Sequence, residues 1–156
     1  MLFAGGSYIS SELDQDLVTN QITGDVTPKG TPLPFSPEWS GSGGAEYSWP
    51  FGGNREFYVN GNFGYVGDMK NALATTLALE TGDFWVLGIG TGLRAEKWSL
   101  ELAVRNLTDE AAPVAINNFD PFFSLNTGSS LPPGVTFNEQ FMIPPRTIQL
   151  AYRYRF

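Results

Sequence analysis

The residue types that most often carry enzymatic chemistry are missing from this chain. It has no histidine and no cysteine, which removes the commonest general base, the commonest zinc ligand and all thiolate chemistry. Glu12, Asp14 and Asp16 have the alternate spacing of calcium ligands. The glycine and the distal glutamate that complete such a loop are absent, however. We therefore expect no catalytic residue, no bound metal and no cofactor.

Two further motifs have a structural explanation. Gly88, Gly90 and Gly92 alternate, but they depart from the G-x-G-x-x-G phosphate-binding fingerprint, and no helical pattern follows them. We expect them to leave room on one face of a strand. Asn106-Leu107-Thr108 matches a glycosylation sequon, which is a frequent chance match.

The last ten residues show which kind of element must position the remaining polar groups. One parity is apolar or aromatic and the other is polar: Ile148, Leu150, Tyr152, Tyr154 and Phe156 against Thr147, Gln149, Ala151, Arg153 and Arg155. Since successive side chains of a strand point to opposite faces, this segment has one apolar and one polar face. Two arginines against a dry core would be costly unless paired. In a water-filled barrel they cost little.

The same alternation predicts six strands, at residues 2–11, 39–49, 56–67, 83–94, 97–106 and 146–156. Several have roughly the 9–11 residues that a tilted strand needs to cross a bilayer. Short connections (50–54 and near 95–96) alternate with long ones (12–38, 68–82 and 107–145). Outer-membrane barrels have this arrangement, with short periplasmic turns and long extracellular loops. The predicted fold is therefore all-β, an antiparallel transmembrane β-barrel segment of about six meander strands.

Charge supports this division of the chain. The net charge of −7 argues against a nucleic-acid partner. The long connections hold most of the acidic residues, but only Lys29 and Lys70 among the basic ones. Acidic outer loops could bind divalent cations or cationic ligands, or they could simply be solvated.

Three segments resemble the end of TonB-dependent outer-membrane receptors in order and spacing. They are Phe35-Ser36-Pro37-Glu38-Trp39, then Arg105-Asn106-Leu107-Thr108-Asp109-Glu110, then Pro145-Arg146-Thr147 opening the last strand to Phe156. The resemblance implies a barrel of about 22 strands with a plugged lumen, of which residues 1–156 supply the last six strands. The plug and the TonB-contacting segment of the family have no counterpart here. We therefore expect this segment to be part of a longer chain and not to fold stably in a membrane alone, because open sheet edges are costly in lipid.

The resemblance also implies a function and partners. It predicts capture of a scarce nutrient, such as a ferric siderophore, at the outer membrane of a Gram-negative bacterium, and import energised through TonB. The expected partners are outer-membrane lipid, the barrel assembly machinery, the small-molecule nutrient and, through the missing N-terminal part, the TonB complex. Tyr152, Tyr154 and Phe156 resemble the signal that the assembly machinery reads.

Site residues follow from face and position. The predicted lumen-facing residues are Glu46, Asn60, Glu101, Arg105, Arg153 and Arg155. They could contact the plug, line a ligand path or supply polarity, and a Glu101–Arg153 pair is plausible. The candidate ligand-loop residues are Phe119, Asp120, Phe122 and Phe123, because apolar surface at a mouth invites binding. Packing of that loop on itself is the alternative.

Aromatic residues near the strand ends fit membrane–water interfaces: Trp39, Trp49, Tyr65, Trp85 and Trp98. Sugar stacking is the alternative. For the whole chain, the competing hypotheses are a soluble or small outer-membrane β-barrel that binds apolar ligands, and a receptor fragment without function. A barrel enzyme is disfavoured by the lack of histidine.

Overall fold

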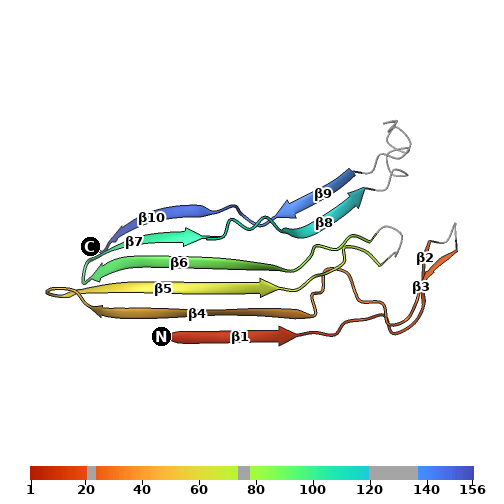
Figure 1. The fold of residues 1–156 in the computed structure, drawn as a ribbon, viewed down its shortest axis with the longest axis horizontal. Helices are drawn as coiled ribbons and strands as arrows, with labels where there is room; N and C mark the ends of the chain where they lie inside the picture. The colour runs from red at the N-terminus through yellow and green to blue at the C-terminus, as the bar shows by residue number, and fades with distance from the viewer. Residues whose placement is uncertain (21–23, 74–77, 120–136) are drawn as a thin grey trace.

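The computed structural model describes residues 1–20, 24–73, 78–119 and 137–156. Six antiparallel strands form one sheet in the order β1-β4-β5-β6-β7-β10 (Figure 1). Their bounds are Leu2–Tyr8 (β1), Trp39–Pro50 (β4), Arg55–Val66 (β5), Phe84–Ala95 (β6), Trp98–Arg105 (β7) and Thr147–Tyr154 (β10). All six predicted strands and their all-β, antiparallel meander are confirmed.

The outer connections hold strands that the sequence reading missed. It treated them as loops of turns and extended segments, whereas β2 (Leu17–Asn20) pairs with β3 (Asp25–Thr27), and β8 (Pro113–Phe119) pairs with β9 (Phe137–Met142). β2 and β3 are too short to show an alternation. The paired residues of β8 and β9 lie 18 to 29 positions apart in the sequence, and pairing at that distance leaves no local signal.

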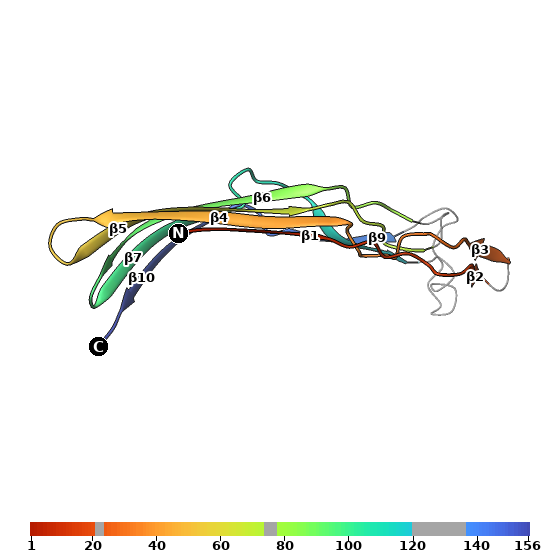
Figure 2. The same cartoon turned by 90° about the horizontal axis from the view of Figure 1, so that it is seen from below.

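The sheet is curved and open. Its short connections and both chain ends lie at one end of the strands, and the long connections lie at the other (Figure 1). β7 and β10 bend away from the plane of β4 and β5 (Figure 2). Within the described residues, the outer edges of β1 and β10 pair with no further strand of this sheet, so the barrel is not closed. No helix among these residues is long and apolar enough to cross a membrane.

The strand register places the apolar alternate residues of neighbouring strands on the same face of the sheet, which we call the apolar face. Tyr47 lies opposite Val59, Leu93 opposite Leu100, and Leu102 opposite Leu150. Their side chains remain open to the surroundings, with Leu150 70% and Tyr47 71% exposed. A water-soluble sheet would bury such a face against a second layer. None of the described strands covers it.

The opposite face, here called the polar face, is the concave one. Side chains on a concave surface converge, and Tyr58 on this face is only 2% exposed. A hollow of about 310 Å³ on the same face is bordered by residues of β5, β6, β7 and β10.

The tight turn between β4 and β5 explains two of the glycines. The Phe51 N–H donates to the Arg55 carbonyl at 2.8 Å, which closes a short loop. Gly52 and Gly53 both have positive φ, 57° and 65°, a backbone conformation that is nearly free of strain only for glycine.

The long connections pack against one another instead of standing apart. The Phe35 N–H donates to the Lys70 carbonyl at 2.8 Å. Asn71, 9% exposed, donates from Nδ2 to the Ile116 carbonyl at 3.1 Å. Thr27, 2% exposed, donates from Oγ1 to the Leu73 carbonyl at 3.2 Å. These bonds join all three long connections at the loop end of the sheet.

Candidate functional site

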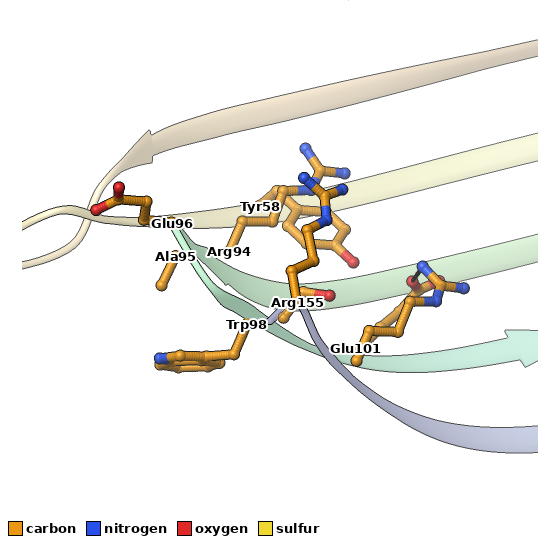
Figure 3. A pocket seen from close by; sticks show the side chains of 9 residues that line it. Tyr58, Arg94, Ala95, Glu96, Trp98, Glu101 and Arg155 are labelled. Atoms are coloured by element: carbon orange, nitrogen blue, oxygen red, sulfur yellow. Dashed lines mark ion pairs between the residues drawn. The ribbon is translucent and has the colours of Figure 1, made fainter.

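Register places the predicted lumen-facing residues together on the polar face. Asn60 lies opposite Glu46 and Gly90, and Glu101 lies opposite Gly92 and Ala151. Arg105 is opposite Thr147, and Arg153 is opposite Ser99. Arg155 follows β10, and its side chain borders the same hollow as Arg94 and Tyr58 (Figure 3). All six therefore share one surface.

An ion pair across three strands is the strongest electrostatic contact on this face. Arg94 of β6 donates to both oxygens of Glu46 of β4, at 2.7 and 3.0 Å, so the pair passes over β5. The Arg94 guanidinium also lies 3.7 Å from the centre of the Tyr58 ring. Bidentate geometry and stacking hold the arginine in one position. The sequence reading did not assign Arg94, although it shares the parity of Gly88, Gly90 and Gly92.

A second ion pair is weaker. Arg153 and Glu101 approach to 3.9 Å, and the Arg153 side chain is 74% exposed. The structure thus contains the pair that strand adjacency suggested. Its length and exposure mean that it adds little stability. Arg155 makes no ion pair within the described part of the chain.

These groups border the 310 Å³ hollow at the turn end of the sheet. Arg94, Arg153 and Arg155 contribute guanidinium groups, and Glu96 and Glu101 contribute carboxylates. In Figure 3 the side chains of Arg94, Arg155 and Tyr58 project to one side of the strands, and the Trp98 ring projects to the other. The hollow is polar and open, and it suits contact with another charged surface.

The alternating glycines of β6 make room for side chains of β5. A Cβ atom at Gly88 would lie 2.5 Å from Asn62 Oδ1, and one at Gly90 would lie 2.6 Å from Asn60 Oδ1. A Cβ atom at Gly92 would lie 2.7 Å from Tyr58 Oη. The expectation that these glycines leave room on one face is confirmed. Side chains of β5 therefore occupy the space over the glycines of β6 on the polar face.

The two motifs at the outer ends of β7 and β10 bind each other. Asn106 Nδ2 donates to the carbonyls of Glu110 and Pro144, both at 2.9 Å, and Asn106 Oδ1 accepts from the Glu110 N–H at 2.9 Å. Asp109 Oδ1 accepts from the Arg146 N–H at 2.9 Å. We call Asn106, Asp109 and Arg146 the terminal clamp. The Asn106 side chain is buried in this clamp, at 3% exposure, and its amide is hydrogen-bonded there. The asparagine of the sequon is therefore not accessible for glycosylation.

The apolar face carries aromatic pairs at both ends. Tyr8 stacks on Trp39 at 4.7 Å and Tyr65 on Trp85 at 4.6 Å at the loop end. Trp49 stacks on Phe57 at 4.8 Å at the turn end. From Trp39 to Trp49, ten residues at about 3.3 Å each span about 33 Å, or about 25 Å along the membrane normal at a tilt of about 40°. That height matches the lipid-facing band of outer-membrane barrels.

The predicted assembly-signal residues lie on the apolar face of the edge strand. Tyr152 and Tyr154 are 64% and 50% exposed, and Phe156 follows on the same parity. Their Cα partners, where the ladder extends, are Leu100 and Trp98. Recognition of these residues by an assembly machinery stays a prediction.

The remaining candidates lie in the outer connections. Phe119 is the last residue of β8, and Asp120, Phe122 and Phe123 lie outside the described residues. Asp14 pairs with Lys29 at 3.6 Å, and Asp16 accepts from the Lys29 N–H at 2.8 Å. Nowhere in the described ranges are three or more His, Cys, Asp or Glu residues grouped to hold a metal ion.

Comparison with known families decides the identity of this two-faced sheet. A family model described as TonB dependent receptor-like, beta-barrel, matches residues 2–107, which is more than half of the 156 residues. The chain belongs to the TonB-dependent receptor family. This is a family of outer-membrane transporters, not of enzymes. No curated protein and no solved structure matches the chain.

The match ends beside the terminal clamp. It includes β1 to β7 and Asn106, whereas Asp109, Arg146 and β10 lie beyond it. The clamp therefore joins the end of the matched region to β10.

Proposed function

We propose that this chain forms the closing wall of an outer-membrane transporter that captures a scarce nutrient, such as a ferric siderophore, and imports it with energy delivered through TonB. The observation that carries the proposal is the curved, two-faced sheet, with an exposed apolar band between aromatic pairs on the outside and ion pairs inside. Residues 1–156 supply six strands, and the rest of a receptor supplies the earlier strands, the plug and the TonB contact.

The unpaired edges of the described sheet support this division. An edge in the bilayer leaves backbone N–H and C=O groups without partners, which costs several kcal/mol for each group. Within the described residues β1 and β10 have such edges. Further strands of the same barrel satisfy them.

The polar face is proposed as lumen wall. Its hollow beside Arg94, Arg153 and Arg155 suits contact with a plug that fills the lumen. The arginines would meet carboxylates or carbonyl groups of the plug. A barrel that binds apolar ligands inside would need the opposite arrangement, with its apolar face turned inward.

The outer connections are proposed to receive the nutrient. Hydrogen bonds join the three connections, so they form a common rim above the wall. Of the candidate ligand-loop residues, Phe119 ends β8, and Asp120, Phe122 and Phe123 follow it in the sequence before β9. Membrane lipid is the proposed neighbour of the apolar face, and the barrel assembly machinery the proposed partner of Tyr152, Tyr154 and Phe156.

The test uses the full-length receptor in a Gram-negative strain that lacks it. We expect the receptor in the outer-membrane fraction, and uptake of labelled ferric chelates under iron limitation that stops when TonB is removed. Uptake that continues without TonB would refute the energised step. Recovery of the receptor in a water-soluble fraction would refute the lipid-facing role of the sheet.

A paired substitution tests the ligand loop. Phe122→Ala should weaken binding of the chelate. Phe51→Ala is the control, because Phe51 is a 49% exposed aromatic at the opposite, turn end of the sheet. Equal loss of binding in both variants would remove the loop from the proposal.

A further inference from the structure

The last strand has a register problem that the strands joined by tight turns do not have. β4 and β5 are joined through residues 51–54, and β6 and β7 through residues 96–97. Such turns fix which residues face each other. β10 pairs with β7 after the longest connection in the chain, residues 106–146. β8 and β9 pair inside this connection, but seven residues (106–112) separate β7 from β8 and only four (143–146) separate β9 from β10. No tight turn therefore sets the register of β10 on β7.

The side chains of β10 discriminate weakly between registers. On the apolar face, the residues of β10 all lie opposite apolar residues of β7. The native pairs are Ile148–Val104, Leu150–Leu102, Tyr152–Leu100 and Tyr154–Trp98. A slip by one residue would move every apolar side chain to the wrong face. A slip by two keeps the faces and replaces one apolar pair with another.

The terminal clamp lies at the end of the β7–β10 ladder, where a slip of β10 would break its hydrogen bonds. Asn106 directly follows β7, and Arg146 directly precedes β10, beside the first pair of the ladder, Arg105–Thr147. Asn106 binds the Pro144 carbonyl, and Asp109 binds the Arg146 N–H, both at 2.9 Å. Pro144 and Pro145 have no N–H, so Arg146 supplies the first donor before the ladder.

Backbone geometry makes the clamp specific. Asn106 and Asp109 have φ of 50° and 57°, a left-handed conformation that asparagine and aspartate tolerate better than other residues with side chains. The resulting turn directs the Asn106 amide and the Asp109 carboxylate toward the segment before β10. Moving β10 by two residues would carry the Pro144 carbonyl and the Arg146 N–H out of reach of both.

We propose that the terminal clamp sets the register of the last strand, so that Asn106 and Asp109 determine how Tyr152, Tyr154 and Phe156 are aligned at the edge of the sheet. The clamp thereby acts in place of the missing tight turn. The clamp needs no ligand, so this proposal can be tested independently of the transport proposal.

Cysteine cross-linking in the full-length receptor measures the register directly. This segment contains no cysteine. Ala103 and Gln149 lie opposite each other on the polar face, where opposite residues are close enough for a disulfide and residues displaced by two are about 7–8 Å apart, which is too far. The Ala103→Cys/Gln149→Cys pair therefore reports the native register. Ala103→Cys with Thr147→Cys or with Ala151→Cys reports a slip in either direction.

Asp109→Ala should lower the ratio of native to slipped cross-link about fivefold, the factor for one lost hydrogen bond of about 1 kcal/mol. It also removes the ion pair between the Asp109 carboxylate and the Arg146 guanidinium, which at 3.7 Å and half exposed adds little. Asn106→Ala, which removes three hydrogen bonds, should lower it further. Glu110→Ala is the matched control, because Glu110 serves the clamp only through its backbone. Asp109→Asn keeps an oxygen for the Arg146 N–H and should retain the native cross-link.

Asp109→Ala also decides the case in which Asn106→Ala fails to assemble. An unchanged cross-link ratio in Asp109→Ala, with normal amounts of assembled receptor, overturns the proposal. So does a loss of the native cross-link in Glu110→Ala as large as that in Asp109→Ala, since the clamp atoms of that control are intact.

Discussion

A single added methyl group should have three different effects at three glycines of the polar face. Gly92→Ala places a Cβ atom against the Leu100 carbonyl oxygen and 2.7 Å from Tyr58 Oη. Gly90→Ala meets Asn60 Oδ1 at 2.6 Å, which is the free end of a flexible side chain. Gly64→Ala meets nothing within 4 Å. The environment of the new methyl therefore changes while the substitution stays the same.

The change in the free energy of unfolding depends on whether the atoms around the new methyl group can shift. Alanine in place of a strand glycine gains about 0.5–1 kcal/mol through the unfolded chain. At Gly92 the Leu100 carbonyl belongs to the β6–β7 ladder and Tyr58 lies under Arg94, so neither can yield. Overpacking of this kind costs about 1–3 kcal/mol. We expect a net loss of about 1–2 kcal/mol for Gly92→Ala, little change for Gly90→Ala, and a gain for Gly64→Ala.

Urea unfolding of the full-length receptor in lipid vesicles, followed by tryptophan fluorescence, measures the order. The midpoints should rise from Gly92→Ala through Gly90→Ala to Gly64→Ala at an unchanged slope. Equal midpoints for Gly92→Ala and Gly64→Ala would refute the reasoning, because the clash at Gly92 would then have no energetic effect.

Three further predictions test the two faces and the end of the chain. Leu102→Arg should destabilise the receptor by about 2–4 kcal/mol, because it puts a charge on the lipid face, and its neighbour Ala103→Arg should be tolerated; equal loss in the same urea assay would contradict the assignment of faces. Glu46→Ala should cost more stability than Glu46→Gln, which can still accept a hydrogen bond from Arg94; urea midpoints in the reverse order would count against the ion pair. Deletion of Phe156 should lower the amount of assembled receptor on unheated gels, and undiminished assembly would remove its signalling role.

Much of the architecture could be predicted because it follows from local sequence patterns. Side chains of a strand alternate with a period of two, so the alternation at residues 147–156 and its counterparts marked six strands and separated their faces. The lengths of the connections added the distinction between turn end and loop end. The paired motifs around Asn106 and Arg146 pointed to the receptor family, which the match over residues 2–107 bears out.

The contacts that define the candidate site depended on tertiary structure. Arg94 and Glu46 are 48 residues apart, and they meet only because the register of two strand pairs places them diagonally across Tyr58. The Asp109–Arg146 bond spans 37 residues, and the residues paired between β8 and β9 are 18 to 29 positions apart. Periodicity assigns a face to each residue, but it carries no information about the offset between strands. Curvature, backbone turns and cross-strand hydrogen bonds set that offset, and with it the contacts of the polar face and the clamp.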